Sequence, residues 1–148
     1  MRAPQTPDDW RAYYTLRWRI LRAPWGQPPG SERDELEDHS IHRLLCDATG
    51  DVLAVGRLHQ LGNQTAQIRY MAVEKGYERQ GLGTRILEQL ECDAEAAGFT
   101  GIVLHARQAA LPFYQRHGYQ LVSPSHLLFG EIQHYRMSKQ LGTDSDTA

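Results

Sequence analysis

The sequence has few cysteines, no long apolar run and no apolar leader. Cys46 and Cys92 are the two cysteines among 148 residues, and because they form neither a CxxC pair nor a dense disulfide framework, we expect reduced thiols that behave as small buried apolar groups. No stretch approaches the roughly 18 consecutive apolar residues of a membrane span, and the first residues have no apolar centre typical of a signal peptide. These absences predict a cytoplasmic protein that does not act on a membrane.

The chain also has no excess of basic charge. It carries 16 Lys and Arg against 18 Asp and Glu, a formal net charge of -2, without the basic run that nucleic-acid binding favours, so we expect no nucleic-acid partner. A composition of 41% hydrophobic and 23% charged residues is typical of one globular domain. We predict a single domain over residues 1–141 and a small polar tail over residues 142–148.

Several catalytic motifs are missing. His39, His42 and Cys46 have no matching cluster of metal ligands, and HExxH is absent, so we predict no metal site. There is no GxSxG sequence or Ser-His-Asp arrangement, and Cys92 falls inside a predicted helix rather than at its electropositive start. The sequence therefore offers no covalent nucleophile.

Caps, turns and periodicity predict an alternating order of helices and strands. Thr6 and Pro7 suit a helix start, apolar residues recur at helical spacing from Leu82, and Gly98 suits a helix end. The predicted helices cover residues 7–21, 31–36, 82–97 and 109–117. The predicted strands cover residues 41–46, 52–59, 65–73, 101–106, a stretch from 119, and 132–138. This order favours an α/β fold on a mixed sheet.

The most informative segment is residues 71–84, MAVEKGYERQGLGT, where a predicted strand leads through glycines into a helix. Gly81 and Gly83 would let a phosphate approach the main chain, and the N–H groups of the first helical turn would point toward it. An ordinary tight turn is the alternative. The segment lacks the Lys-Ser or Lys-Thr of a Walker loop, and Ile86 stands where a dinucleotide-binding loop needs a small residue.

Two ordered motifs carry a resemblance to a known family. The Met-Ala-Val sequence before the Gly-Leu-Gly of residues 81–83, and the FYQRHGY sequence of residues 113–119, resemble the GNAT superfamily of acyl-CoA-dependent N-acyltransferases. The resemblance covers residues 65–139. It implies a mostly antiparallel central sheet with helices on both faces and an acyl-CoA cleft between splayed strands.

The resemblance assigns roles residue by residue. Met71, Ala72 and Val73 match the strand that pairs with the pantetheine arm. The diphosphate loop corresponds to Arg79, Gln80, Gly81, Leu82, Gly83 and Thr84. Arg107 stands where the family commonly has Asn at a strand end, and it could contact a cofactor phosphate or merely cover the strand. Tyr114 matches the tyrosine beside the thioester sulfur, usually the general acid, with a place in the aromatic core as the alternative.

The chain departs from the family pattern at two further places. Glu78 stands where the family has Arg or Gln three residues before the first glycine, and we expect its carboxylate to face solvent. Gln67 and Arg69 occupy the positions from which a Glu or His often takes the proton of the amine, and neither is a useful base. A relayed water or His134, on the last predicted strand, would then serve, although His134 could also be a structural histidine.

We therefore expect an N-acetyltransferase that moves the acetyl group of acetyl-CoA directly to a primary amine of a small molecule or peptide. The alternative is a catalytically weak acyl-CoA-binding or sensing module. The acceptor stays open: an acidic segment could suit a cationic amine or could simply be solvated. That segment contains Glu32, Asp34, Glu35, Glu37 and Asp38. A homodimer also stays open.

Overall fold

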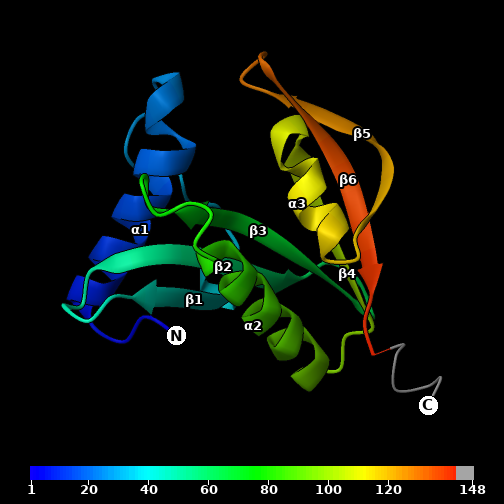
Figure 1. Ribbon diagram of the computed structural model, residues 1–148, viewed down its shortest axis with the longest axis horizontal. Helices are drawn as coiled ribbons and strands as arrows, with labels where there is room; N and C mark the ends of the chain where they lie inside the picture. The colour runs from blue at the N-terminus through cyan, green and yellow to red at the C-terminus, as the bar shows by residue number, and fades with distance from the viewer. Residues whose placement is uncertain (143–148) are drawn as a thin grey trace. The chain divides into compact units, whose positions relative to one another are not determined.

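The computed structural model describes residues 1–142 and contains a mixed sheet flanked by helices (Figure 1). The α-helices are α1 (Pro7–Leu21), α2 (Leu82–Ala96) and α3 (Leu111–Arg116). The strands are β1 (Ile41–Cys46), β2 (Val52–Gln60), β3 (Thr65–Val73), β4 (Gly101–Arg107), β5 (Gln120–Leu128) and β6 (Ile132–Gln140). Short 3-10 helices are η1 (Ala23–Trp25), η2 (Glu37–His39) and η3 (Gln108–Ala110). Apart from Gly142, the predicted tail of residues 142–148 lies outside the described residues.

The strand order of the sheet is β1-β2-β3-β4-β6-β5. β1 and β2 are antiparallel, as are β4 with β6 and β5 with β6, whereas β3 and β4 run parallel. The β3–β4 register covers Thr65 to Gln67 opposite Gly101 to Val103. The prediction of a mixed, mostly antiparallel sheet is therefore confirmed.

The chain divides into two compact units, and each is described by itself. The first comprises Met1–His59 and Ile68–Asp93. The second comprises Gln60–Gln67 and the described residues from Ala94 on. One of the boundaries falls inside β3, directly after the residues that pair with β4. One domain over residues 1–141 stays a prediction.

Helix α1 begins at a capping box. The Thr6 hydroxyl accepts from the Asp9 N–H at 3.1 Å, and the Asp9 carboxylate accepts from the Thr6 N–H at 3.3 Å. The same carboxylate accepts from the Arg2 guanidinium at 2.6 Å. Arg2 also exchanges main-chain hydrogen bonds with Leu44 on β1, so the N-terminal residues lie beside that edge of the sheet.

Helices cover both faces of β2 in the first unit. Val55 packs with Tyr13 and Leu16 of α1 in one buried cluster. A Cβ on the neighbouring Gly56 would instead lie 2.6 Å from Ile86 Cγ2, an α2 side chain. Because successive strand residues face opposite sides, α1 and α2 cover opposite faces of the sheet. This arrangement confirms the expected helices on both faces.

The second unit builds its own core around β4 and β6. Leu104 pairs with Met137 across these strands, and both are buried. Tyr119, which follows α3, is also buried, and its ring meets that of Tyr114 edge-on at 5.8 Å between centroids. None of the helices in residues 1–142 is long and apolar enough to cross a membrane.

Two predictions were wrong. Residues 31–36 form turns rather than a helix, because the Asp34 carboxylate accepts from the Leu36 N–H and the Glu37 carboxylate accepts from the Asp34 N–H. Such local bonds compete with helical ones. Both cysteines are free, but Cys46 is half-buried and Cys92 exposed, because position 92 lies on the outer side of α2.

Candidate active site

The loop between β3 and α2 exposes its main chain. Gly76 and Gly81 have positive φ values of 92° and 81°, and a Cβ built on Gly81 would meet nothing within 4 Å. The Gly81 carbonyl accepts from the Arg85 N–H at 3.1 Å, which marks Gly81 as the N-cap residue directly before α2. The first N–H groups of a helix have no acceptor within it and carry its positive dipole end. This junction therefore has the geometry of an anion site.

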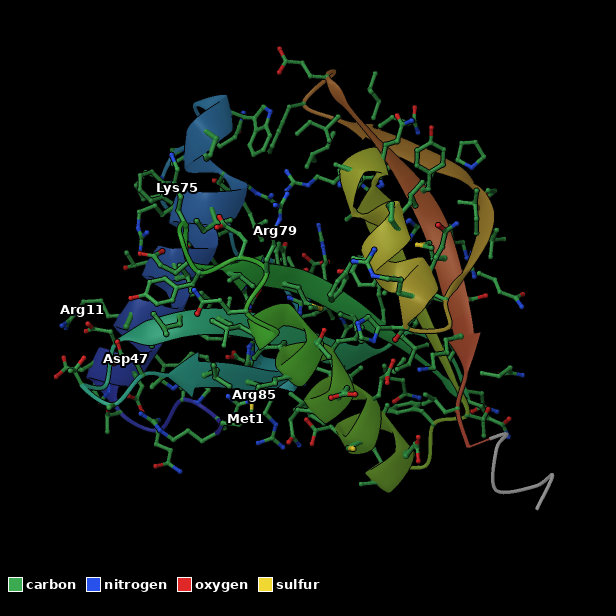
Figure 2. All side chains as sticks on the ribbon, in the orientation of Figure 1. Met1, Arg11, Asp47, Lys75, Arg79 and Arg85 are labelled. Atoms are coloured by element: carbon green, nitrogen blue, oxygen red, sulfur yellow. The ribbon has the colours of Figure 1, made fainter. Side chains whose placement is uncertain are left out.

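Three charged residues of this loop, Lys75, Glu78 and Arg79, are exposed. Glu78 is exposed as predicted, and its carboxylate accepts from the Gly76 N–H at 2.9 Å, so it bonds to the loop itself. Lys75 and Arg79 lie on the same loop (Figure 2). Arg79 has a left-handed φ of 66°, a conformation that nothing in its residue type indicates. Arg79 and Gln80 are both exposed ahead of the helix.

Strand β3 is distorted immediately before the segment predicted to bind pantetheine. Tyr70 is 7% exposed and has φ of 59°, whereas a strand residue normally has a negative φ. Its backbone costs on the order of 1–2 kcal/mol and persists because surrounding groups hold the ring. Met71, Ala72 and Val73 follow it directly. Sequence reasoning missed this distortion, because tyrosine favours ordinary strand geometry.

The second unit holds the candidate acid and its neighbours. Tyr114 lies on α3, with its ring edge-on to Phe113 at 5.0 Å. Burial raises the pKa of Tyr114 to about 12, although the positive charge of Arg107 acts in the opposite direction. A phenol with this pKa keeps its proton at neutral pH and can donate it. Arg107 is the last residue of β4 and is exposed. In the antiparallel register of β4 and β6 it lies opposite His134.

His134 is held in one tautomer. Its Nδ1 lies 3.0 Å from the Ile132 carbonyl oxygen, and because a carbonyl only accepts, Nδ1 carries the proton. In the neutral ring Nε2 then has the lone pair that a base needs.

The His134 ring belongs to a cluster of imidazoles. It stacks on His126 with centroids 4.4 Å apart, and His126 lies 5.5 Å from His105. Adjacent strands β4, β6 and β5 contribute one ring each. Beyond the presence of the histidines themselves, no pattern in the sequence indicates this cluster.

The structure assigns the predicted residues to both units. Met71 to Val73 and Arg79 to Thr84 belong to the first unit; Arg107, Tyr114 and His134 belong to the second. Within the second unit, Arg107 influences the Tyr114 phenol and pairs with His134, so these three are brought together.

Comparison with known proteins decides the family. A model of the "Acetyltransferase (GNAT) family" matches residues 10–119. The chain belongs to the GNAT family. The "Uncharacterized N-acetyltransferase YjcF" of Bacillus subtilis (strain 168) is 34% identical over 128 residues, which are 86% of this chain and 89% of that protein. The resemblance stated from the motifs is confirmed, and the chain is an acyltransferase.

Solved structures agree with this chain on the fold. An acyl-CoA N-acyltransferase from Pseudomonas aeruginosa has a TM-score of 0.78 at 24% identity, with 91% of this chain and 92% of that chain covered. An aminoglycoside 6'-N-acetyltransferase complexed with coenzyme A has a TM-score of 0.75 at 17% identity, with coverage of 91% and 92%.

The β3–α2 junction of this GNAT chain fits the diphosphate of an acyl-CoA. The open space at Gly81 leaves room for phosphate oxygens, the α2 amides can donate to them, and Arg79 supplies positive charge. Within residues 1–142, no group of three His, Cys, Asp or Glu side chains could hold a metal ion. GNAT enzymes use an acyl-CoA as donor.

The acidic segment of this GNAT chain is not simply solvated. Glu32 is 4% exposed, and Asp34 and Glu37 form ion pairs with the buried Arg57 at 2.6 and 2.7 Å. The exposed members are Glu35 and Asp38. The expectation of a simply solvated segment is therefore wrong for Asp34 and Glu37, which form ion pairs with Arg17, Arg57 and Arg69. The preference for a cationic amine stays a prediction. Sequence reasoning missed Arg57, which lies within an apolar strand.

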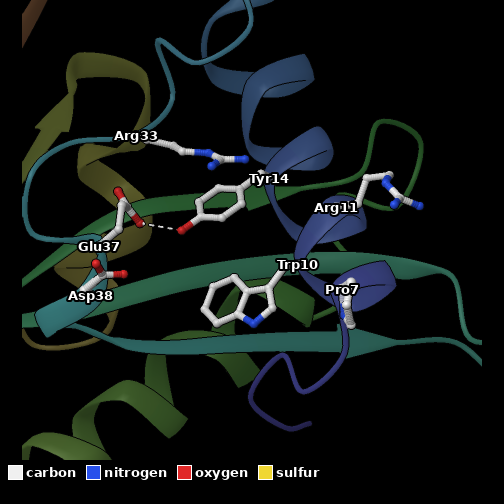
Figure 3. Close-up of a pocket in the computed structure, with 7 residues that line it drawn as sticks. All are labelled: Pro7, Trp10, Arg11, Tyr14, Arg33, Glu37 and Asp38. Atoms are coloured by element: carbon white, nitrogen blue, oxygen red, sulfur yellow. Dashed lines mark hydrogen bonds between the residues drawn. The ribbon is translucent and has the colours of Figure 1, made fainter.

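Glu37 and Asp38 of this segment help to line a pocket of about 500 Å³ in the first unit (Figure 3). Trp10 and Tyr14 line it with stacked rings, and the Arg33 guanidinium lies 3.8 Å above the Tyr14 ring. The Tyr14 hydroxyl donates to Glu37 at 3.1 Å. Burial, together with the charge of Glu37 and this hydrogen bond, raises the pKa of Tyr14 to about 12. Arg33 already occupies the outer face of the tyrosine ring.

Proposed function

We propose that this GNAT enzyme transfers the acetyl group of acetyl-CoA directly to a primary amine of a small molecule or peptide. The observation that carries the proposal is the β3–α2 junction, where Gly81 leaves the main chain open at the start of a 15-residue helix. That junction is suited to the diphosphate of the donor. Two free thiols, Cys46 and Cys92, support a reducing and hence cytoplasmic location.

In the proposed complex, three parts of the chain hold acetyl-CoA. The main chain of Met71, Ala72 and Val73 pairs with the pantetheine arm. The diphosphate accepts hydrogen bonds from the loop and helix start formed by Arg79, Gln80, Gly81, Leu82, Gly83 and Thr84. Arg107 adds a charge-assisted hydrogen bond to a phosphate of the donor.

The proposed reaction needs one base and one acid. The acceptor nitrogen loses a proton to Nε2 of His134, directly or through a water, and attacks the thioester carbon. An N–H of the Met71 to Val73 segment stabilises the oxyanion. The C–S bond then breaks as the amide forms, and the Tyr114 hydroxyl gives its proton to the departing sulfur. No acyl-enzyme forms in this scheme.

The test is release of the CoA thiol from acetyl-CoA with a panel of amines. Tyr114→Phe keeps the ring and removes the acid, so kcat should fall about 10²–10⁴-fold while acetyl-CoA affinity changes little. Tyr119→Phe removes a neighbouring buried phenol from the same aromatic group and is the matched control. His134→Gln removes the proposed base and should lower kcat, while acetyl-CoA affinity changes little.

Two results would contradict the proposal. Tight acetyl-CoA binding without turnover on any amine would indicate an acyl-CoA-binding module instead. A loss of thermal stability in Tyr114→Phe with kcat retained would place this tyrosine in the core alone.

A further inference from the structure

Four guanidinium groups surround the Tyr70 ring in the first unit. The Cζ atoms of Arg17, Arg69, Arg57 and Arg22 lie 4.3, 4.5, 4.9 and 5.5 Å from its centroid. We call these four residues the arginine cluster. Arg17 and Arg57 are 0% exposed. Such a concentration of buried positive charge is costly unless anionic groups balance it.

Among the described residues, the ion pairs of Arg17, Arg57 and Arg69 involve two carboxylates. Asp34 contacts Arg57 at 2.6 Å and Arg69 at 2.8 Å. Glu37 contacts Arg17 at 3.0 Å and Arg57 at 2.7 Å. Two negative charges therefore face the three positive charges that pair with them. The cluster retains a net positive charge.

The arginine cluster also has more hydrogen-bond donors than the protein supplies with acceptors. The Nε atoms of Arg17 and Arg57 are buried without an acceptor in the described part of the chain. Arg69 differs from these two because its side chain is 44% exposed. Over residues 1–142 its guanidinium donates one hydrogen bond, to Asp34 at 2.8 Å, although it carries five N–H groups. Arg69 therefore presents unused donors to solvent.

The position of Arg69 connects this surplus to the acceptor. Arg69 precedes Met71 by two residues, and two residues of fully extended chain span at most about 7 Å. In the proposed function, Met71 begins the segment that holds the thioester end of the donor. A reacting amine must come within about 3.5 Å of the thioester carbon, so another group of the same molecule can reach Arg69.

We propose that the acceptor is a small amine that also carries an oxyanion group, a carboxylate or a phosphate, and that Arg69 binds this group. The inference rests on the proposed function and specifies its substrate class. A planar guanidinium with free N–H groups donates two parallel hydrogen bonds to either oxyanion. Asp34 fixes one end of Arg69 and leaves the other donors for the acceptor.

The other explanation is that the arginine cluster only anchors residues 31–39. Under that explanation Arg69 contributes to stability and not to acceptor choice. The exposed Glu35 and Asp38 on the same segment would then favour cationic acceptors over acidic ones. Acceptor preference and the effect of Arg69 on it therefore separate the two explanations.

The experiment compares matched acceptors with the wild-type enzyme and three variants. The acceptors are the common α-amino acids with their amides, and O-phosphoethanolamine with ethanolamine. The variants are Arg69→Gln, Arg69→Lys and, as control, Arg11→Gln, which removes an exposed arginine paired with Asp8. Release of the CoA thiol gives kcat and KM for each acceptor, and calorimetry gives the acetyl-CoA affinity.

We expect the acidic member of at least one pair to have the higher kcat/KM. Whether that acid carries a carboxylate or a phosphate shows which oxyanion Arg69 binds. Arg69→Gln should raise KM for that acid about ten- to hundredfold, the range of a lost charge-assisted hydrogen bond, and leave KM for the neutral partner and acetyl-CoA affinity unchanged. Arg69→Lys should restore part of the loss.

Equal or better use of the neutral acceptors, or an equal effect of Arg69→Gln on both members of a pair, would overturn the inference while the proposed function stands. Absence of turnover with every acceptor would overturn both.

Discussion

Replacing the buried Arg57 by methionine should cost a large part of the protein's stability. Arg57 donates to both Asp34 oxygens at 2.6 and 3.0 Å, to Glu37 at 2.7 Å, and to Nδ1 of His59 at 3.1 Å. Removing one partner of a buried ion pair costs about 3–5 kcal/mol. Asp34 keeps Arg69 and Glu37 keeps other donors, so we expect a loss near the lower end, about 3 kcal/mol, and a decrease in Tm of about 10 °C.

The same replacement should change how stability depends on pH. Burial alone would raise the pKa of Asp34, but hydrogen bonds from Arg57 and the Leu36 N–H and the charge of Arg69 outweigh it and lower the pKa from 3.8 to about 2. A carboxyl with a lowered pKa stabilises the fold fully above its unfolded pKa and loses this contribution as pH falls through the folded value. The difference in stability between the wild type and the Arg57→Met variant should therefore be constant from neutral pH to about pH 5 and shrink as the pH falls toward 2.

Urea unfolding followed by tryptophan fluorescence at several pH values measures both effects. Arg11→Met is the control, because its ion pair with Asp8 is exposed and should contribute less than about 0.5 kcal/mol. An Arg57→Met protein as stable as the wild type at neutral pH would refute the reasoning. A loss of stability that is the same at pH 7 and pH 3 would show that packing, rather than ion pairing, is its cause.

Two further substitutions test the glycines. Gly81→Val should abolish acetyl-CoA binding measured by calorimetry, because the side chain fills the open phosphate approach; Gly50→Val, also at positive φ and in open space but in the β1–β2 turn, should bear similar strain and still bind. Gly56→Ala should destabilise the fold by about 1–3 kcal/mol in urea unfolding, because its Cβ would lie 2.6 Å from Ile86 and 2.9 Å from Leu90; unchanged stability would mean that α2 shifts freely.

Local patterns in the sequence were sufficient to predict most of the elements. The Thr6-Pro7 start, the helical apolar repeat from Leu82 and the Gly98 stop all depend on neighbouring residues, and α1 and α2 were predicted within one residue of their observed ends. The same holds for the glycine loop, since a strand, a glycine pair and a helix follow one another along the chain.

The parts that could not be predicted depend on residues distant in sequence. Arg17 and Arg57 are 40 positions apart (57 minus 17) and meet Glu37 only in the folded unit. Charged residues are usually exposed, so the sequence favoured a solvated acidic segment. The Tyr70 conformation has the same origin, because the guanidinium groups around its ring stabilise a backbone that tyrosine would not adopt by itself.

The mutual dependence of the arginine cluster and its carboxylates limits how this chain can evolve. Loss of any one member leaves the others with fewer opposite charges, so Arg17, Arg57, Asp34 and Glu37 should be inherited as a set and change together or not at all. Arg69 is exposed and shares Asp34 with Arg57, so replacing Arg69 leaves Asp34 paired with Arg57. Selection can therefore alter position 69 by single mutations, and descendants of this protein would acquire new acceptors there while the buried set stays fixed.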